Sequence, residues 1–311
     1  MSDAFFLGSI NLDISLFVDT FPTLGQSKSA QDTFFSCGGK GANQAYACSK
    51  NSASTTLVSK VGNDAFADHL RVLLKQRTRQ QTFLLESELH TALAHIFIQQ
   101  SDAQNLIVSS AGANKDISVE EVQQFEEKIA SANLLAIQFE NNLAAVAKAI
   151  EIAKQANVWV LLDPAPFEPE MASVFQQVDV LTPNEFEASQ ISGANVHDGM
   201  SAHQAAQIIQ KKYGISKVII TLGSTGVFAM DENRTYFSPA YQCAVRDTTG
   251  AGDAFNGAFI AHYIKGYNFF EAVEFANAYA STAVEGVGAS YMPEPHLAKR
   301  RYLDRKNESK K

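Results

Sequence analysis

The chain has 311 residues, of which 46% are hydrophobic and 19% charged, an ordinary globular composition that can fill a sizeable core. Its formal net charge of −8 argues against a nucleic-acid partner, because such proteins present cationic surface to phosphates. The three cysteines, Cys37, Cys48 and Cys243, are odd in number and far apart, which indicates reduced thiols. There is no secretion-signal pattern and no apolar run near the ~20 residues of a membrane helix, so we expect a soluble cytoplasmic protein.

Short apolar runs alternate with amphipathic stretches along most of the chain. Buried strands are predicted at 4–10, 54–62, 133–139, 158–163, 178–183 and 217–223. Helices are predicted at 41–51, 64–75, 118–129, 142–156, 200–213, 252–265 and 269–285. This alternation predicts one α/β domain spanning 1–311, with a mostly parallel central sheet flanked by helices on both faces.

Two segments, at about 14–36 and 91–110, break this rhythm because they contain only short strand-like runs. Strands without intervening helices have to pair with each other, so we expect a small second sheet, acting as a lid, near the edge of the first. Its exposed edges and apolar side chains favour a homodimer formed through the lid. The charged end of the chain, 299–311, is interpreted as a solvated helix end.

Several polar clusters follow predicted strands, at the sheet end where open α/β sheets bind ligands. Asn11 and Asp13, two apart, suit neighbouring hydroxyls, and Lys40 with Asn43 supplies further hydrogen-bonding groups at a helix start. Glu140 ends another strand and could reach the same crevice. Each cluster taken alone also fits an ordinary turn or helix cap.

The stretch DTTGAGDAFNGAF, 247–259, leads through glycines into a buried helix that begins near Gly252 and Asp253. The free N–H groups of a first helical turn, with the helix dipole behind them, form an anion site. Asp253 should stay ionised there, although a plain capping role is the alternative. The stretch matches neither the Walker A loop nor the dinucleotide-binding glycine pattern, which argues against a dehydrogenase.

Two further clusters concern a metal and a nucleotide. Asn184 and Glu187 lie three apart at a helix start and suit a magnesium ion or its waters, while reciprocal capping is the simpler interpretation. The turn TLGSTG, 221–226, could bind a nucleotide or form a hairpin corner. The histidines show no metal-binding spacing. Together, the clusters predict a phosphate donor, a metal and a hydroxylated acceptor.

The chain resembles the ribokinase-like (PfkB) carbohydrate kinases over roughly residues 4–293. The shared motifs occur in the family's order: GSINLD (8–13), GGKGANQA (38–45), AGAN (111–114), DPAP (163–166), TPNE (182–185), TLGSTG (221–226) and DTTGAGDAFNG (247–257). GGKGAN points to the pentose-kinase branch. The resemblance implies a three-layer ribokinase-like fold and ATP-dependent phosphorylation of the ribose 5-hydroxyl. The alternatives are a kinase for another small sugar or nucleoside, 2-deoxyribose first, and a non-catalytic sugar- or nucleotide-sensing protein on the same fold.

The resemblance also implies roles for individual residues. Asp253 would be the general base, next to an anion hole formed by Gly250, Ala251 and Gly252. The sugar-binding positions would be Asn11, Leu12, Asp13, Gly39, Lys40, Gly41, Ala42, Asn43, Glu140 and Asp253. The nucleotide-binding positions would be Asn184, Glu187, Thr221, Leu222, Gly223, Ser224, Thr225, Gly226, Gly252 and Asn277, with Glu187 associated with Mg²⁺. An activating K⁺ would be held by Asp247, Thr249, Ala283, Gly286, Gly288 and Ser290.

The potassium site departs from the family pattern at one position. The family supplies a serine side chain after the last glycine, in a pattern like G-A-x-P-S. This chain reads GASYMP at 288–293, with Met292 at that position. Ser290 is the alternative ligand.

Overall fold

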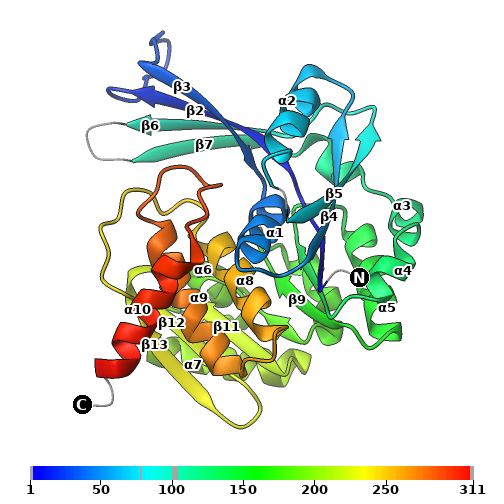
Figure 1. Cartoon of the computed structure of the whole chain (residues 1–311), viewed down its shortest axis with the longest axis vertical. Helices are drawn as coiled ribbons and strands as arrows, with labels where there is room; N and C mark the ends of the chain where they lie inside the picture. The colour runs from blue at the N-terminus through cyan, green and yellow to red at the C-terminus, as the bar shows by residue number, and fades with distance from the viewer. Residues whose placement is uncertain (1–2, 78, 100–103, 309–311) are drawn as a thin grey trace.

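The computed structural model describes residues 3–77, 79–99 and 104–308, so the predicted segments 91–110 and 299–311 lie partly outside these ranges. Within the described residues, the chain forms a nine-stranded sheet and a separate four-stranded sheet. Figure 1 shows the smaller sheet projecting from one end of the main body.

The main sheet is mostly parallel, as predicted. Its order is β13-β12-β11-β10-β9-β8-β1-β4-β5, and only the pairs β11/β12 and β12/β13 are antiparallel. The strands are β1 (Ala4–Leu7), β4 (Thr55–Gly62), β5 (Gln80–Ser87), β8 (Leu134–Gln138), β9 (Trp159–Asp163), β10 (Val180–Leu181), β11 (Lys217–Thr221), β12 (Gly226–Met230) and β13 (Thr235–Pro239). The edge strand β5 and the hairpin β12–β13 were not predicted from the sequence.

Side chains alternate between the two faces of the central strands and fill two apolar cores. Phe5 and Leu7 of β1 enter one core, while Ala4 and Phe6 enter the other. Helices that contribute to the first core include α5 (Leu143–Gln155), α6 (Glu185–Ser192) and α7 (Gly199–Tyr213). The second core is covered by α1 (Lys40–Lys50), α8 (Ala251–Tyr263), α9 (Phe269–Ala283) and α10 (Pro295–Glu308). The result is the predicted three-layer architecture.

The helix predicted at 118–129 is interrupted. It forms α3 (Val119–Gln123) and α4 (Glu126–Ala130), with Phe125 at the break. The Phe125 ring lies against the rings of Phe5 and Phe83, so the break sets this side chain into the core. No helix within the described residues is long and apolar enough to span a membrane.

The predicted second sheet, here called the lid, is confirmed. It consists of β2 (Asn11–Val18), β3 (Asp32–Gly38), β6 (Leu93–Gln99) and β7 (Asn105–Ser110) in the order β3-β2-β6-β7. Its first strand starts at Asn11, earlier than expected. Asn11 and Asp13 therefore lie on the lid strand β2 and not at the end of β1. Helix α2 (Ala65–Leu74) packs against β2 and β3, where the rings of His69 and Phe35 meet.

The order of the strands reverses beside β1. From β1 the chain continues to β4 and β5 on one side, and it later returns to add β8, β9, β10 and β11 on the other. The connections after β1 and β8 therefore leave the sheet in opposite directions. Such a reversal opens a ligand-binding crevice at the carboxyl ends of the strands.

Candidate active site

The segments that follow β1, β3 and β8 meet at this reversal of strand order. Ser9 lies after β1 and donates its hydroxyl to Glu140 Oε2, after β8. The backbone N–H of Lys40, the first residue of α1, donates to the same carboxylate oxygen at 3.2 Å. Glu140 thus links the start of α1 to the segment after β1.

Asp253 lies in the first turn of α8, which begins at Ala251. Its carboxylate is buried and accepts hydrogen bonds from Asn43 Nδ2 at 3.2 Å and Gln44 Nε2 at 3.1 Å. The structure therefore joins GGKGANQA and DTTGAGDAFNG, two motifs that are far apart in the sequence.

Gly257 explains why the two helices can meet so closely. A Cβ atom at this position would lie 2.4 Å from the carbonyl oxygen of Gln44 and 2.5 Å from Cβ of Ala47. Gly257 is four residues after Asp253 and thus on the same helix face. The close contact along this face keeps the Asp253 carboxylate within hydrogen-bond reach of α1.

The predicted anion hole has the backbone geometry of a sharp helix entry. Gly250 is the N-cap of α8 with φ 77°, a left-handed conformation that favours glycine. A Cβ at Gly250 would also lie 2.2 Å from the carbonyl oxygen of Ala289. At Gly252, in contrast, a Cβ would meet no atom within 4 Å. The first turn of α8 is therefore accessible at Gly252, beside N–H groups that have no partner inside a helix.

A hydrogen-bond network that was not predicted from the sequence surrounds Asp253. Gln44 Nε2 donates to Asp163 Oδ2 at 2.8 Å as well as to Asp253, and Gln44 Oε1 accepts from Gln138 Nε2 at 2.8 Å. Lys40 Nζ lies 3.7 Å from Asp163 Oδ2. Asp163 ends β9 within the family motif DPAP, and its position after an apolar strand was a usable signal. Gln44 and Gln138, in contrast, take part only through contacts between distant segments, which no local sequence pattern reveals.

The site concentrates acidic groups around Lys40. Desolvation opposes the positive charge of Lys40, but Asp163, Asp253, Glu140 and Glu187 outweigh it and raise the pKa of this ammonium, so it stays charged. Burial raises the pKa of Asp253 to about 7, with a further upward contribution from Asp163 and a downward one from Lys40. Asp253 therefore titrates close to neutral pH, because burial opposes the ionisation that the helix dipole was expected to favour.

Asp13 belongs to the same electrostatic group. It is 3% exposed, and burial raises its pKa to about 7, with further upward contributions from Glu140 and Asp253. A buried, ionisable oxygen acceptor of this kind suits ligand hydroxyls, which can donate to it.

Asn11, the first residue of β2, is also predicted to bind the sugar, and Asn114 of the AGAN motif holds its side chain. Its Oδ1 accepts from Asn114 Nδ2 at 2.8 Å, and Asn114 Oδ1 accepts from the N–H of Ile10 at 3.0 Å. Leu12, between the two polar residues, is 1% exposed and faces the apolar core. Its N–H donates to the Ala92 carbonyl at 2.9 Å.

Arg77 braces the loop that carries the predicted sugar-binding glycines, a role the sequence analysis missed. It is 6% exposed, and its guanidinium donates to the carbonyls of Ala42 at 2.8 Å and Cys37 at 3.0 Å. These bonds enclose the segment that contains Gly39 and Gly41. In the sequence, Arg77 lies in a charged, surface-like stretch, and nothing there indicated burial.

The side chain of Asn43 has one buried polar atom that a ligand could bind. Its amide nitrogen bonds Asp253, but its buried Oδ1 has no hydrogen-bond partner among the described residues. Leaving a buried polar atom unpaired costs about 1–3 kcal/mol. A hydroxyl-bearing ligand would satisfy this oxygen.

Asn184 and Glu187, two of the predicted nucleotide-binding residues, form the helix cap that was the simpler interpretation of their spacing. Asn184 and Glu187 make a complete capping box at the start of α6, with bonds of 2.9 and 2.8 Å. Asn184 also bridges Thr221 of β11. Burial raises the pKa of Glu187 to about 7, with a further upward contribution from Asp163.

The TLGSTG motif is a hairpin corner between β11 and β12. Leu222 is buried, Gly223, Ser224 and Thr225 are exposed, and the N–H of Leu222 donates to the Gly226 carbonyl at 2.8 Å. Asn277 of α9 donates its amide to Ser238 Oγ at 2.8 Å. Its bonds hold the end of the strand that pairs with β12.

The two implied metals differ in how well the residues fit them. Among the described residues, no group of three or more His, Cys, Asp or Glu side chains is arranged to hold a metal ion. Mg²⁺ usually keeps waters and substrate phosphates as ligands, so one or two carboxylates, such as Glu187 and Asp163, would fit its need for protein ligands.

The predicted potassium residues come together only in part. Asp247 Oδ1 accepts from the N–H of Thr249 at 2.9 Å, and its Oδ2 accepts from the N–H of Gly288 at 2.8 Å. These bonds bring Thr249 and Gly288, two of the expected carbonyl ligands, next to Asp247. The Ala283 carbonyl instead accepts from the N–H of Gly286 at 3.0 Å. Met292, in contrast, is buried in the apolar core at 5% exposure, and Ser290 is partly buried. The methionine at the usual serine position therefore has a packing role.

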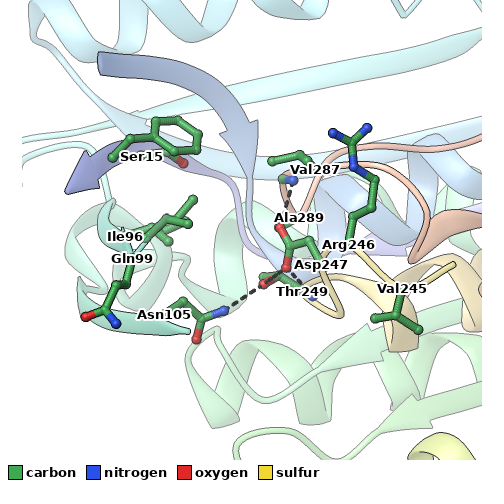
Figure 2. A pocket seen from close by; sticks show the side chains of 13 residues that line it. Ser15, Ile96, Gln99, Asn105, Val245, Arg246, Asp247, Thr249, Val287 and Ala289 are labelled. Atoms are coloured by element: carbon green, nitrogen blue, oxygen red, sulfur yellow. Dashed lines mark hydrogen bonds between the residues drawn. The ribbon is translucent and has the colours of Figure 1, made fainter. Parts of the chain in front are cut away.

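A cavity of about 580 Å³ opens between the inner face of the lid and two loops of the main body. Figure 2 shows Asp247 and Thr249 at its wall, with Asn105 of β7 reaching across from the lid. Asn105 Nδ2 donates to Thr249 Oγ1 at 3.3 Å, so the lid and the loop before α8 are in contact. The lining residues are Ser15, Phe17, Ile96, Ile98, Gln99, Asn105, Val245, Arg246, Asp247, Thr249, Val287, Gly288 and Ala289.

The fold and this site define a phosphotransferase that acts on an alcohol group. The chain belongs to the pfkB family of carbohydrate kinases, whose model matches residues 1–297. It is 36% identical over 284 residues to a ribokinase of Haemophilus influenzae, covering 91% of this chain and 92% of the relative. It is 31% identical to a deoxyribokinase of Salmonella typhi with the same coverages. The structure of an Arabidopsis thaliana ribokinase complexed with ribose and ATP superimposes with a TM-score of 0.85 and 28% identity, over 97% of this chain and 98% of that one.

Proposed function

We propose that the protein transfers the γ-phosphoryl group of ATP to the 5-hydroxyl of D-ribose, giving D-ribose 5-phosphate. The observation that carries this proposal is the convergence of Asp253, Asp13 and Lys40 in one crevice, next to the accessible first turn of α8. A buried base, an acceptor for sugar hydroxyls and an anion site are the three parts that sugar phosphorylation needs.

The residues divide the work as follows. Asp253 accepts the proton of the attacking hydroxyl, while Asn43 and Gln44 fix the orientation of its carboxylate. Phosphoryl transfer passes through a loose transition state in most analyses, so the N–H groups at 250–252 contribute by stabilising the charge that develops on the phosphoryl oxygens. Lys40 supplies positive charge between the sugar side and the phosphate side of the site.

The excess of carboxylates bears on the form of the nucleotide. Asp163, Glu140, Glu187 and Asp253 surround one ammonium group, so the site would repel a bare polyphosphate. We therefore propose that ATP binds with Mg²⁺, near Glu187 and Asp163. When bound, the metal would neutralise the phosphate charge. An activating K⁺ near Asp247 and the carbonyls of Thr249 and Gly288 is part of the same proposal.

An ADP-release assay with a panel of sugars tests the proposal. Phosphorylation of ribose with kcat/KM well above that of other pentoses is the expected result, and absence of ADP release with every sugar would overturn it. The second candidate acceptor is 2-deoxyribose, because a deoxyribokinase is among the similar proteins. Asn11 favours ribose, since Asn114 orients its amide and leaves Nδ2 to meet a 2-hydroxyl.

The acidity of Asp253 predicts how activity depends on pH. The base must be ionised, and burial raises its pKa to about 7, so kcat/KM should rise with pH up to about 7 and then level off. Replacing Asp163 by asparagine removes a charge that raises this pKa, and the acid limb should then move to lower pH. Steady-state rates in overlapping buffers from pH 5.5 to 8.5 measure both. A flat wild-type profile over this range would contradict the prediction.

We also propose a cytoplasmic homodimer that forms through the lid. The register places Ile14, Phe35 and Val108 on one face of the lid and Ser15, Ile96 and Ile107 on the other. Ser15 and Ile96 line the cavity, so the first face is turned away from the cavity, and α2 covers part of it at Phe35. On that outer face Leu106 is 47% and Val108 58% exposed, an apolar surface on a sheet that also has open edges.

Replacing Val108 by aspartate should therefore convert the dimer into a monomer, because the charge would be buried in the interface. Sedimentation equilibrium measures the change. Met200→Asp, which charges an exposed apolar side chain on α7, is the control and should leave the dimer intact. A wild type that stays monomeric at all concentrations would rule out the interface.

A further inference from the structure

The C-terminal helix α10 supplies two arginines to segments that flank the proposed nucleotide site. Arg301 and Arg305 are four residues apart and so lie on one face of the helix. Their side chains are only 23% and 25% exposed. Figure 1 shows α10 beside α9, against the body of the molecule. The charged end of the chain is thus a helix end, as expected, and many of its residues, such as Lys299 and Arg300, are exposed. The face that carries Arg301 and Arg305 packs against the body.

Arg305 holds the end of β13. Its guanidinium donates to the carbonyls of Pro239 at 2.7 Å and Ala240 at 3.0 Å, and its central carbon lies 3.2 Å from the centre of the Tyr241 ring. It also reaches Glu274 Oε1 at 3.3 Å, a buried carboxylate that accepts from the Tyr241 hydroxyl at 2.6 Å. The segment 239–241 is therefore fixed by hydrogen bonds, stacking and charge together.

This segment anchors the turn predicted to bind the nucleotide. Pro239 pairs with Gly226 in the β12–β13 ladder, and the N–H of Ala240 donates to the Thr225 carbonyl at 3.2 Å. Asn277 donates to the Pro239 carbonyl at 3.0 Å, so it shares this acceptor with Arg305. Displacement of 239–241 would consequently displace the turn 223–226.

Arg301 holds the other side of the loop 240–250. It donates to the Ser281 carbonyl at 2.8 Å and to Glu285 Oε1 at 2.6 Å, and the same carboxylate oxygen accepts from the N–H of Ala244 at 3.2 Å. One residue earlier, the Val284 carbonyl accepts from the N–H of Asp247 at 3.2 Å. Arg301 therefore fixes the path of the chain just before the first turn of α8.

We propose that Arg301 and Arg305 are positioning residues for the phosphoryl donor, an inference that rests on the proposed function. Arg305 sets the position of the nucleotide-binding turn, so it acts on ATP affinity. Arg301 sets the approach of the loop to the anion hole, so it acts mainly on turnover. Neither side chain lines the cavity beneath the lid.

The test compares Arg305→Met, Arg305→Lys and Arg301→Met with the wild-type protein. Arg300→Met is the matched control, because Arg300 is an exposed arginine on the same helix. Calorimetric titration with Mg²⁺-ATP gives the Kd of the nucleotide without catalysis, and steady-state rates give kcat and the KM of ribose. Thermal melting shows whether each variant is folded.

Arg305→Met should raise the Kd for ATP ~5- to 30-fold, the effect of losing charge-assisted hydrogen bonds, while the KM for ribose stays within ~2-fold. Arg305→Lys keeps the cation but cannot bond two carbonyls in the guanidinium geometry, so an intermediate Kd is expected. If Arg305→Met does not fold, Arg305→Lys tests the inference. Arg301→Met should lower kcat ~5- to 30-fold with ATP affinity changed less than ~3-fold.

Two outcomes would overturn the inference: an ATP Kd within ~2-fold of wild type in both Arg305 variants, or equal losses for ATP and ribose, which indicate general loosening. A wild type that binds ATP but phosphorylates no sugar would refute the proposed function instead. The ATP titrations would still decide the role of Arg305 in that case.

Discussion

Replacing Asp253 by asparagine should lower kcat ~10²- to 10⁴-fold, the usual contribution of a general base, while sugar and ATP still bind. Asparagine has nearly the same shape but accepts no proton from the sugar hydroxyl. It would also present an amide to Asn43 or Gln44, which both donate to Asp253. Asn43 can turn its unpaired Oδ1 toward this amide, so the packing survives. Stopped-time ADP release and equilibrium binding of ribose and ATP measure the separate effects.

Stability provides the internal control for this variant. A buried carboxyl whose pKa is raised in the folded state binds more protons there than in the unfolded chain, so its folded state loses stability as pH rises from ~4 to ~7. Asparagine removes this loss, and the variant should therefore melt higher than wild type at pH 8. Asp68→Asn, on the exposed side of α2, should change neither melting nor turnover much. Turnover of Asp253→Asn within tenfold of wild type would refute the assignment of the base.

Replacing Asp13 by alanine should lower kcat/KM for the sugar ~10²- to 10³-fold, because a buried acceptor for sugar hydroxyls is lost. The Kd for ATP should change less than ~2-fold, since Asp13 lies on the lid strand β2 and the nucleotide residues lie beyond β10 and β11. Steady-state rates at varied ribose and calorimetric ATP titration measure the two quantities.

Asp32→Ala is the matched control, because Asp32 is an exposed carboxylate on the neighbouring lid strand β3. It should leave sugar kinetics unchanged. Equal losses in both variants would mean that lid stability alone accounts for the effect. Equal losses of ribose and ATP affinity in Asp13→Ala would likewise argue against a sugar-binding role.

Much of the fold followed from the sequence because buried parallel strands are continuous apolar runs. The prediction failed where strands are short or polar. β5 contains Gln, Thr and Glu among its apolar residues, and β12 and β13 form a hairpin after a turn that was read only as a possible corner. The lid was predicted in outline because its segments lack helical periodicity, but its first strand begins at Asn11 since register, which no local pattern reveals, decides where pairing starts.

The site divides in the same way. Asp253, Lys40, Asp13 and Glu140 could be proposed because chemistry-bearing residues stood after strands and within family motifs. The residues that support them, such as Gln44 and Arg77, could not be predicted from the sequence. Gln44 matters because it bridges two carboxylates contributed by other segments, and Arg77 matters because its guanidinium is buried under a loop far away in sequence. Tertiary contacts alone distinguish such residues from ordinary polar ones.

The lid is assembled around the strand that carries Asp13. β3 and β6 are hydrogen-bonded to the two edges of β2, so these strands and Asp13 form one mechanical piece. Swinging that piece outward would carry the carboxylate away from Glu140 and Asp253, relieving their mutual repulsion. We therefore expect this repulsion to favour an open lid before the sugar binds, and sugar hydroxyls bound to Asp13 to offset it. Binding of the sugar and closure of the lid are then expected to be coupled.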